Sequence, residues 1–95
     1  MTNVAVKFVG VLHEVFKKKQ VMLKFAKPPS VKEIVEKLAE TSLEARQHVF
    51  ETETGQIHPA LLILVDGKEI SALEGAETQV KDGDKIVLIS VSHGG

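Results

Sequence analysis

The chain has 95 residues, of which 43% are hydrophobic, and its net charge is −1 from 12 Lys+Arg and 13 Asp+Glu. This length suits one domain with a core of its own, so we expect no second catalytic domain. The absence of cysteine excludes disulfides, zinc-thiolate sites and thiol nucleophiles. A net charge near zero supplies no general attraction to phosphate backbones or anionic lipids, so we expect neither direct nucleic-acid binding nor membrane binding.

The start of the chain indicates a location. Met1 to Lys7 reaches a charge before any apolar stretch as long as the core of a signal peptide. No apolar run approaches the length of a membrane span. We therefore expect an intracellular, cytoplasmic protein.

Alternating apolar residues predict two strands in the first part of the chain, and together these form a hairpin with a long loop. Their apolar positions are Val4, Val6 and Phe8 in residues 3–9, then Val21, Leu23 and Phe25. Gly10 ends the first strand. Residues 11–16 fit either a short helical turn or a continued strand, and the lysines at 17–19 form a solvated turn.

Helix signals follow Pro28 and Pro29, which end the second strand because neither has an N–H for a sheet. Ser30 and Glu33 match the capping box that opens helices. Apolar residues then recur at helical spacing, at Val31, Ile34, Val35, Leu38 and Ala39. The pattern predicts one main helix with one buried face. A thinner stripe at Leu43, Gln47 and Phe50 predicts a possible second, shorter helix within residues 41–50.

The last third of the chain predicts three more strands. The apolar run at residues 60–65 ends in Asp66-Gly67, a strong hairpin turn signal, and Glu69-Ile70 returns as a short strand. Residues 75–84 have the composition of a loop, and residues 86–91 form a final apolar strand. The resulting order predicts an α+β domain with a mixed sheet and the main helix packed across one face.

The sequence contains no recognisable catalytic constellation. The four histidines, His13, His48, His58 and His93, are scattered, and no pair has metal-binding spacing on a helix. No glycine-rich phosphate loop or nucleophile elbow occurs. Asp82 and Asp84 fit a turn, because a calcium loop needs further oxygen ligands at fixed spacing. We expect no active site, no metal and no bound cofactor.

The chain ends in Gly94-Gly95 directly after a predicted strand. Such an end has no side chains and can thread a narrow channel. Its carboxylate is ionised at neutral pH and can attack the α-phosphate of ATP, giving an acyl-adenylate. A sulfur nucleophile or a lysine amine can then displace AMP, which leaves a thiocarboxylate or an isopeptide bond. Taken alone, the two glycines fit an inert chain end equally well.

The element order, the Lys-Asp-Gly-Asp-Lys run at residues 81–85, the last apolar strand and the Gly-Gly end resemble the ubiquitin-like β-grasp sulfur carriers. The tail, residues 89–95, is similar to that of the ubiquitin-related modifier branch and departs from it at Val91 and Ser92. The small subunit of molybdopterin synthase is the alternative branch. Its aromatic residue, prolines and Ala-Gly-Gly end do not match Ser90, Ser92 and His93.

The resemblance implies a ubiquitin-like β-grasp domain at residues 1–92 with a flexible tail at 93–95. It also implies a carrier and not an enzyme. A ubiquitin-activating-type adenylyltransferase would use ATP to adenylate Gly95, and a sulfur donor protein bearing a persulfide would convert it to a thiocarboxylate. The sulfur would pass to a wobble uridine of tRNA, through a tRNA-thiolation enzyme, or to a pterin precursor. The activated end could also be joined to lysines of target proteins.

We expect partners to bind the sheet face that the main helix leaves uncovered. If Val87 and Ile89 point outward, Leu62 or Leu64 would extend an exposed apolar patch. His93 belongs to the same predicted contact set. The sequence leaves two alternatives to this interpretation open. These apolar residues could all be core, or the domain could be a non-reactive ubiquitin-like interaction module.

Overall fold

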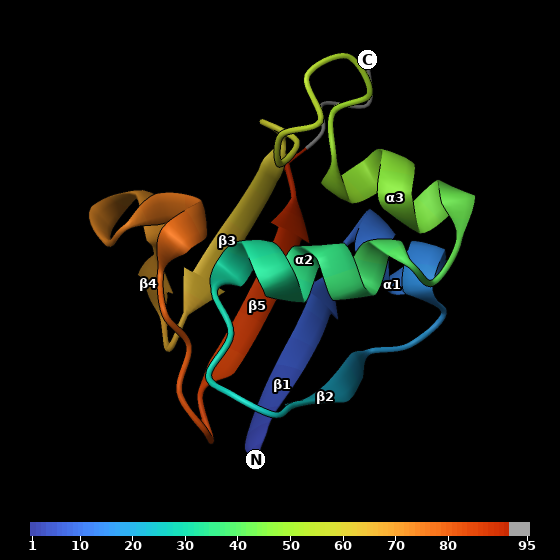
Figure 1. The fold of residues 1–95 in the computed structure, drawn as a ribbon. Helices are drawn as coiled ribbons and strands as arrows, with labels where there is room; N and C mark the ends of the chain where they lie inside the picture. The colour runs from blue at the N-terminus through green and yellow to red at the C-terminus, as the bar shows by residue number, and fades with distance from the viewer. Residues whose placement is uncertain (92–95) are drawn as a thin grey trace.

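The computed structural model describes residues 1–91, which form a five-stranded sheet with helices against it (Figure 1). The strands are β1 (Thr2–Val9), β2 (Gln20–Phe25), β3 (Leu61–Val65), β4 (Lys68–Glu69) and β5 (Lys85–Ser90). The helices are α1 (Val11–Phe16), α2 (Val31–Ala39) and α3 (Leu43–Val49), with 3₁₀ turns η1 (Ile70–Ala72) and η2 (Gly75–Glu77). The spatial order is β2-β1-β5-β3-β4. The central pair β1 and β5 is parallel and the other pairs are antiparallel, so the predicted α+β class with a mixed sheet is confirmed.

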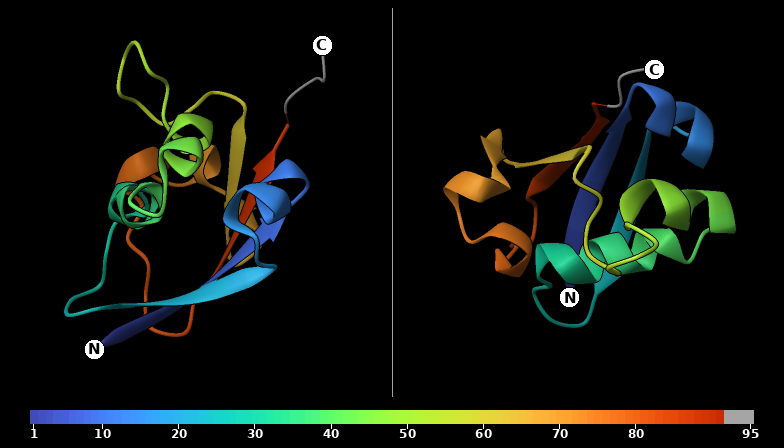
Figure 2. Two further views of the ribbon diagram at one scale, coloured as in Figure 1. Left: turned by 90° about the vertical axis from the view of Figure 1, so that its right-hand side faces the viewer. Right: turned by 90° about the horizontal axis from the view of Figure 1, so that it is seen from above.

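The core lies between the sheet and α2, which crosses the sheet together with α3 on one side of it (Figure 2). Alternation on β1 turns Val4, Val6 and Phe8 toward this side, as predicted. The parallel register sets Val6 beside Ile86 and Phe8 beside Leu88. The two central strands therefore present adjacent rows of buried side chains to the helix.

Residues 11–16, which the sequence left open between helix and strand, form the helix α1. Gly10 has a φ of 73°, and Lys17, at the far end, has a φ of 59° in the left-handed region. These two residues let the chain leave β1 and return into β2. Phe16 stacks on Phe8, with ring centroids 4.2 Å apart and planes inclined by 6°. This contact fixes α1 against the sheet.

Helix α2 begins with the predicted capping box. The Ser30 hydroxyl accepts the Glu33 N–H at 3.2 Å, and the Glu33 carboxylate accepts the Ser30 N–H at 2.8 Å. All five apolar residues of the predicted stripe are buried: Val31, Ile34, Val35, Leu38 and Ala39. The main helix and its buried face are thus confirmed.

The second short helix, α3, is present, but the face predicted for it is wrong. Leu43 is 72% exposed and Gln47 is also exposed, whereas Ala45 and Val49 are buried. Phe50 is buried too, but its φ of −120° and ψ of 144° are extended, so it is not part of the helical stripe. A stripe that counts a residue beyond the helix end points to the wrong side.

The β3–β4 hairpin turns at Asp66-Gly67, where φ is 48° and 85°, as a type I′ turn requires. The return strand is shorter than predicted. Ile70 lies in η1 and not in a strand, because the Glu69 carboxylate accepts the Ser71 N–H and turns the chain. The loop at residues 75–84 contains η2, which the sequence did not indicate.

No helix within residues 1–91 is both long enough and apolar enough to cross a lipid bilayer.

Candidate partner-binding face

Alternation on β5 divides its apolar residues into two sets. Ile86 and Leu88 are 1% and 0% exposed and belong to the core under α2. Val87 and Ile89 are half-buried and lie on the other side of the sheet. Of the two arrangements that the sequence left open, the structure has the one in which Val87 and Ile89 point away from the core, and not the one in which the whole strand is core.

The β3–β5 register shows which residues of the apolar run at 60–65 lie beside Val87 and Ile89. Leu64 pairs with Val87, and Leu62 pairs with Ile89. Leu62 and Leu64 are half-buried, while Ile63 and Val65 between and beside them are buried. The structure therefore brings the four predicted contact residues of β3 and β5 together. We call this group, Leu62, Leu64, Val87 and Ile89, the open-face patch.

Two residues of β1 border the patch and were missed from the sequence. Val9 pairs with Ile89 and is half-buried, and Lys7 pairs with Val87 and is exposed. The signal was present, because placing Val4, Val6 and Phe8 inward sends the odd-numbered residues outward. What could not be read from the sequence was that β1 lies beside β5.

A charged turn lies beyond the Leu64–Val87 end of the patch. Asp66 and Lys85 exchange backbone and side-chain hydrogen bonds there, each at 2.8 Å. The Lys85 N–H, and next the Asp84 side chain, hold the pKa of the Asp66 carboxyl below its usual value of 3.8. Lys85 itself is exposed. The face therefore combines an apolar centre with ionised groups at its edge.

The C-terminal end of β5 leads directly to the last residues of the chain. The Val91 N–H donates to the Ala60 carbonyl oxygen at 2.8 Å, and Val91 is 47% exposed. This bond holds the end of the described chain beside the start of β3. His93, Gly94 and Gly95 lie outside the described residues, so their predicted roles stay predictions.

Three histidines can be placed, and they lie in separate local settings. His13 is exposed on α1. His48 Nδ1 lies 2.9 Å from the Glu44 carbonyl oxygen, and His58 Nδ1 accepts the Ala60 N–H at 3.0 Å. Within residues 1–91 no three His, Asp or Glu side chains gather in a way that could hold a metal ion.

Comparison with solved structures confirms the predicted fold family. The small archaeal modifier protein 1 of Methanosarcina acetivorans superposes with a TM-score of 0.86 at 26% identity, over 100% of this chain and 98% of that one. A chain in the crystal structure of the Amycolatopsis orientalis BexX/CysO complex superposes with a TM-score of 0.70 at 25% identity, over 97% and 99%.

A mixed sheet crossed by one main helix, with an apolar open face and close likeness to these proteins, defines a ubiquitin-like β-grasp protein. Residues 3–95 match the family Urm1 (Ubiquitin related modifier). The chain belongs to that family.

A curated relative supports the assignment. The ubiquitin-related modifier 1 of Laccaria bicolor is 35% identical over 69 residues, which cover 73% of this chain and 56% of that protein. The chain therefore matches little more than half the length of this relative.

Proposed function

We propose that this chain is a ubiquitin-like modifier and sulfur carrier that reacts through the carboxylate of Gly95. The observation that carries the proposal is that the family match extends to residue 95 and so includes Gly94-Gly95. A family resemblance limited to the folded core would fit an interaction module equally well. One that includes the terminal glycines favours chemistry at the chain end.

The chemistry has two steps, both performed by partner enzymes. In the first, a Gly95 carboxylate oxygen attacks the α-phosphate of ATP, pyrophosphate leaves, and an acyl-adenylate forms. In the second, the terminal sulfur of a protein persulfide attacks the acyl carbon and AMP leaves. A thiol of the partner then cleaves the S–S bond, which releases the carrier as a thiocarboxylate and leaves a disulfide on the partner.

The activated terminus has two proposed destinations. As a thiocarboxylate it donates sulfur for tRNA thiolation. As an acyl group it is attacked by a lysine amine of a target protein, which forms an isopeptide bond. The alternative function is that of the small subunit of molybdopterin synthase. In that case the thiocarboxylate would donate its sulfur to a pterin precursor.

The open-face patch is the proposed contact for the adenylyltransferase. It is apolar, lies outside the core and adjoins the strand that leads to the terminus. Four residues beyond Val91 span at most about 14 Å, so an enzyme bound to this face can keep the carboxylate within its own reach. The related Amycolatopsis chain was solved in a complex, which supports the binding of a partner protein by a chain of this fold.

Intact-mass spectrometry tests the proposal. The chain is incubated with a ubiquitin-activating-type adenylyltransferase, ATP and a persulfide donor. We expect release of AMP and the mass gain of one oxygen-to-sulfur exchange, located to the C-terminal peptide. The matched control lacks Gly95 alone. No mass gain and no AMP release would favour the non-reactive interaction module, and stable co-purification with a larger molybdopterin synthase subunit would favour that alternative.

A further inference from the structure

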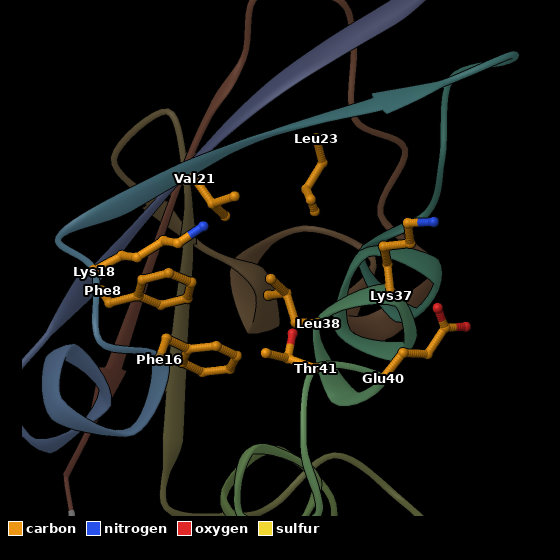
Figure 3. A pocket seen from close by; sticks show the side chains of 9 residues that line it. All are labelled: Phe8, Phe16, Lys18, Val21, Leu23, Lys37, Leu38, Glu40 and Thr41. Atoms are coloured by element: carbon orange, nitrogen blue, oxygen red, sulfur yellow. The ribbon is translucent and has the colours of Figure 1, made fainter.

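A second apolar surface lies on the α2 side of the sheet, away from the open-face patch. It is a hollow of about 290 Å³ between β2, the end of α1 and the end of α2 (Figure 3). Its lining is Phe8, Phe16, Val21, Leu23 and Leu38, with Lys18, Lys37, Glu40 and Thr41. We call it the β2–α2 groove.

The groove exists because α2 does not cover the edge of the sheet. On β1, Val4 and Val6 are 0% exposed. On the neighbouring β2, Val21 and Leu23 face the same side but are only half-buried. The apolar side chains of β2 therefore pack against the core from one side and border the groove on the other.

Strand β2 is also an edge strand, since within the described chain it pairs with β1 alone. The Phe8 N–H donates to the Lys19 carbonyl oxygen at 2.9 Å, so these two opposite residues form a hydrogen-bonded pair. Such pairs alternate with non-hydrogen-bonded pairs along an antiparallel ladder. Val21 and Leu23 therefore direct their N–H and C=O groups to β1. Met22 and Lys24 direct theirs to the free edge. A strand added there would find unpaired backbone groups.

The side chains of an added strand would enter the groove. Residues opposite Val21 and Leu23 would point to the same side of the sheet as these two do. That side is the α2 side, where Phe16 and Leu38 complete an apolar lining. An extended segment with apolar residues at every second position thus matches both the edge and the groove.

The charge around the edge selects the partner further. Residues 17–27 contain five lysines, at 17, 18, 19, 24 and 27, and no Asp or Glu, in a chain whose net charge is −1. Lys18 and Lys37 line the groove, where Glu40 is the one carboxylate. A second copy of this chain would bring like charges together, which is how natural sheet edges avoid pairing with themselves. An acidic partner would be attracted instead.

We propose that the β2–α2 groove binds an acidic, extended peptide segment of a partner protein, which adds to β2 as a sixth strand. The site is distinct from Gly95 and from the open-face patch. It would allow non-covalent docking while the terminus is free or attached.

The probe is a fluorescent synthetic peptide with alternating valines between pairs of glutamates, added to the full chain without ATP or activating enzyme. We expect saturable binding by fluorescence anisotropy. In ¹⁵N spectra the shift changes should be confined to β2, the lysine turn and the end of α2. A probe with lysines in place of the glutamates should bind at least tenfold more weakly. A probe whose amide groups are N-methylated at the positions that donate hydrogen bonds to β2 should also bind at least tenfold more weakly.

Two variant pairs test the two halves of the argument. Lys18→Glu with Lys37→Glu should weaken binding of the acidic probe roughly tenfold or more. Lys32→Glu with Lys68→Glu, which makes the same change in net charge away from the groove, should not. Met22→Pro removes a free-edge N–H without touching the β1 ladder and should cost roughly five- to tenfold in affinity, whereas Met22→Thr keeps the N–H.

Three results would overturn the proposal. One is binding that ignores N-methylation, because backbone pairing would then be absent. Another is binding that shifts open-face residues such as Val87 and not β2. The third is concentration-dependent dimerisation through β2, measured by sedimentation, which would assign the edge to a second copy. Failure of thiocarboxylate formation would leave these measurements unaffected, so this proposal and the proposed function can fail separately.

Discussion

Asp66 and Lys85 are joined by two reciprocal hydrogen bonds: the Asp66 N–H donates to the Lys85 carbonyl oxygen, and the Lys85 N–H donates to Asp66 Oδ1, both at 2.8 Å. The pair ties the β3–β4 turn to the first residue of β5. Asp66 also occupies the left-handed region, with a φ of 48°. One residue therefore serves both the turn and the register between two strands.

The lowered pKa of Asp66 makes its contribution depend on pH. A carboxyl whose pKa is lower in the folded state stabilises the fold above its unfolded value near 3.8, and that stabilisation is lost as pH falls through the folded value. Asp66→Asn keeps the left-handed preference but removes the charge. We expect a small destabilisation at pH 7 that shrinks toward zero in acid, measured by urea unfolding at several pH values. A difference independent of pH would contradict this.

Removal of the α2 cap should lower stability measurably. Ser30→Ala loses the hydroxyl that accepts the Glu33 N–H, and such substitutions cost about 1 kcal/mol. Urea unfolding monitored by circular dichroism measures the change. Ser30→Thr retains a hydroxyl and is the control, so an equal loss in both variants would mean that the cap is not the cause.

The buried face of α3 can be tested directly. Leu43 is exposed and Ala45 is 0% exposed. Leu43→Glu should therefore change the free energy of unfolding by no more than about 0.5 kcal/mol. Ala45→Leu should destabilise by roughly 1–3 kcal/mol, because added methylene groups overpack a filled core. The reverse order would restore the face first predicted from the sequence.

A charge in the open-face patch should separate binding from folding. Val87→Glu should reduce the rate of adenylation tenfold or more while the protein remains folded, since Val87 is only half-buried. Leu43→Glu, at a 72% exposed position on α3 on the other side of the sheet, should leave that rate unchanged. Leu88→Ala, in the core, should cost about 2–5 kcal/mol of stability. Unfolding of Val87→Glu would show that Val87 contributes mainly to packing.

Deletion of Gly94 and Gly95 should abolish AMP release and thiocarboxylate formation and leave the domain folded. Among residues 1–91 the buried core cluster runs from Val4 to Leu88, and we expect it to tolerate removal of two residues beyond that range. Thermal unfolding followed by circular dichroism measures the second half of the prediction. A sharply lower melting temperature would show that the terminus contributes to folding.

Local sequence was a good guide wherever one periodicity acted alone. The capping box and the stripe of α2 needed only residues within one helix, and the Asp66-Gly67 turn needed only its own backbone preferences. Prediction failed where a helix or a strand ended at a residue that the apolar pattern did not mark. The stripe predicted for α3 counted Phe50, which lies beyond the end of the helix, and Ile70 lies outside the expected strand because Glu69 caps a turn there.

The candidate site follows the same division. That Val87 and Ile89 share one face of a strand follows from a period of two residues. That Leu62 and Leu64 join them, and that Val9 and Lys7 border them, depends on pairing between strands far apart in the chain. Register is a property of two strands at once, so no single segment encodes it.

The sequence alone determined the order of the five strands, the main helix and the Gly-Gly terminus, because each rests on residues close together in the chain. The tertiary structure decided which apolar residues are core and which form the open-face patch. It also left β2 as an edge strand that α2 does not cover. The physical reason is that burial depends on what lies across the sheet, and a strand's own pattern cannot specify that.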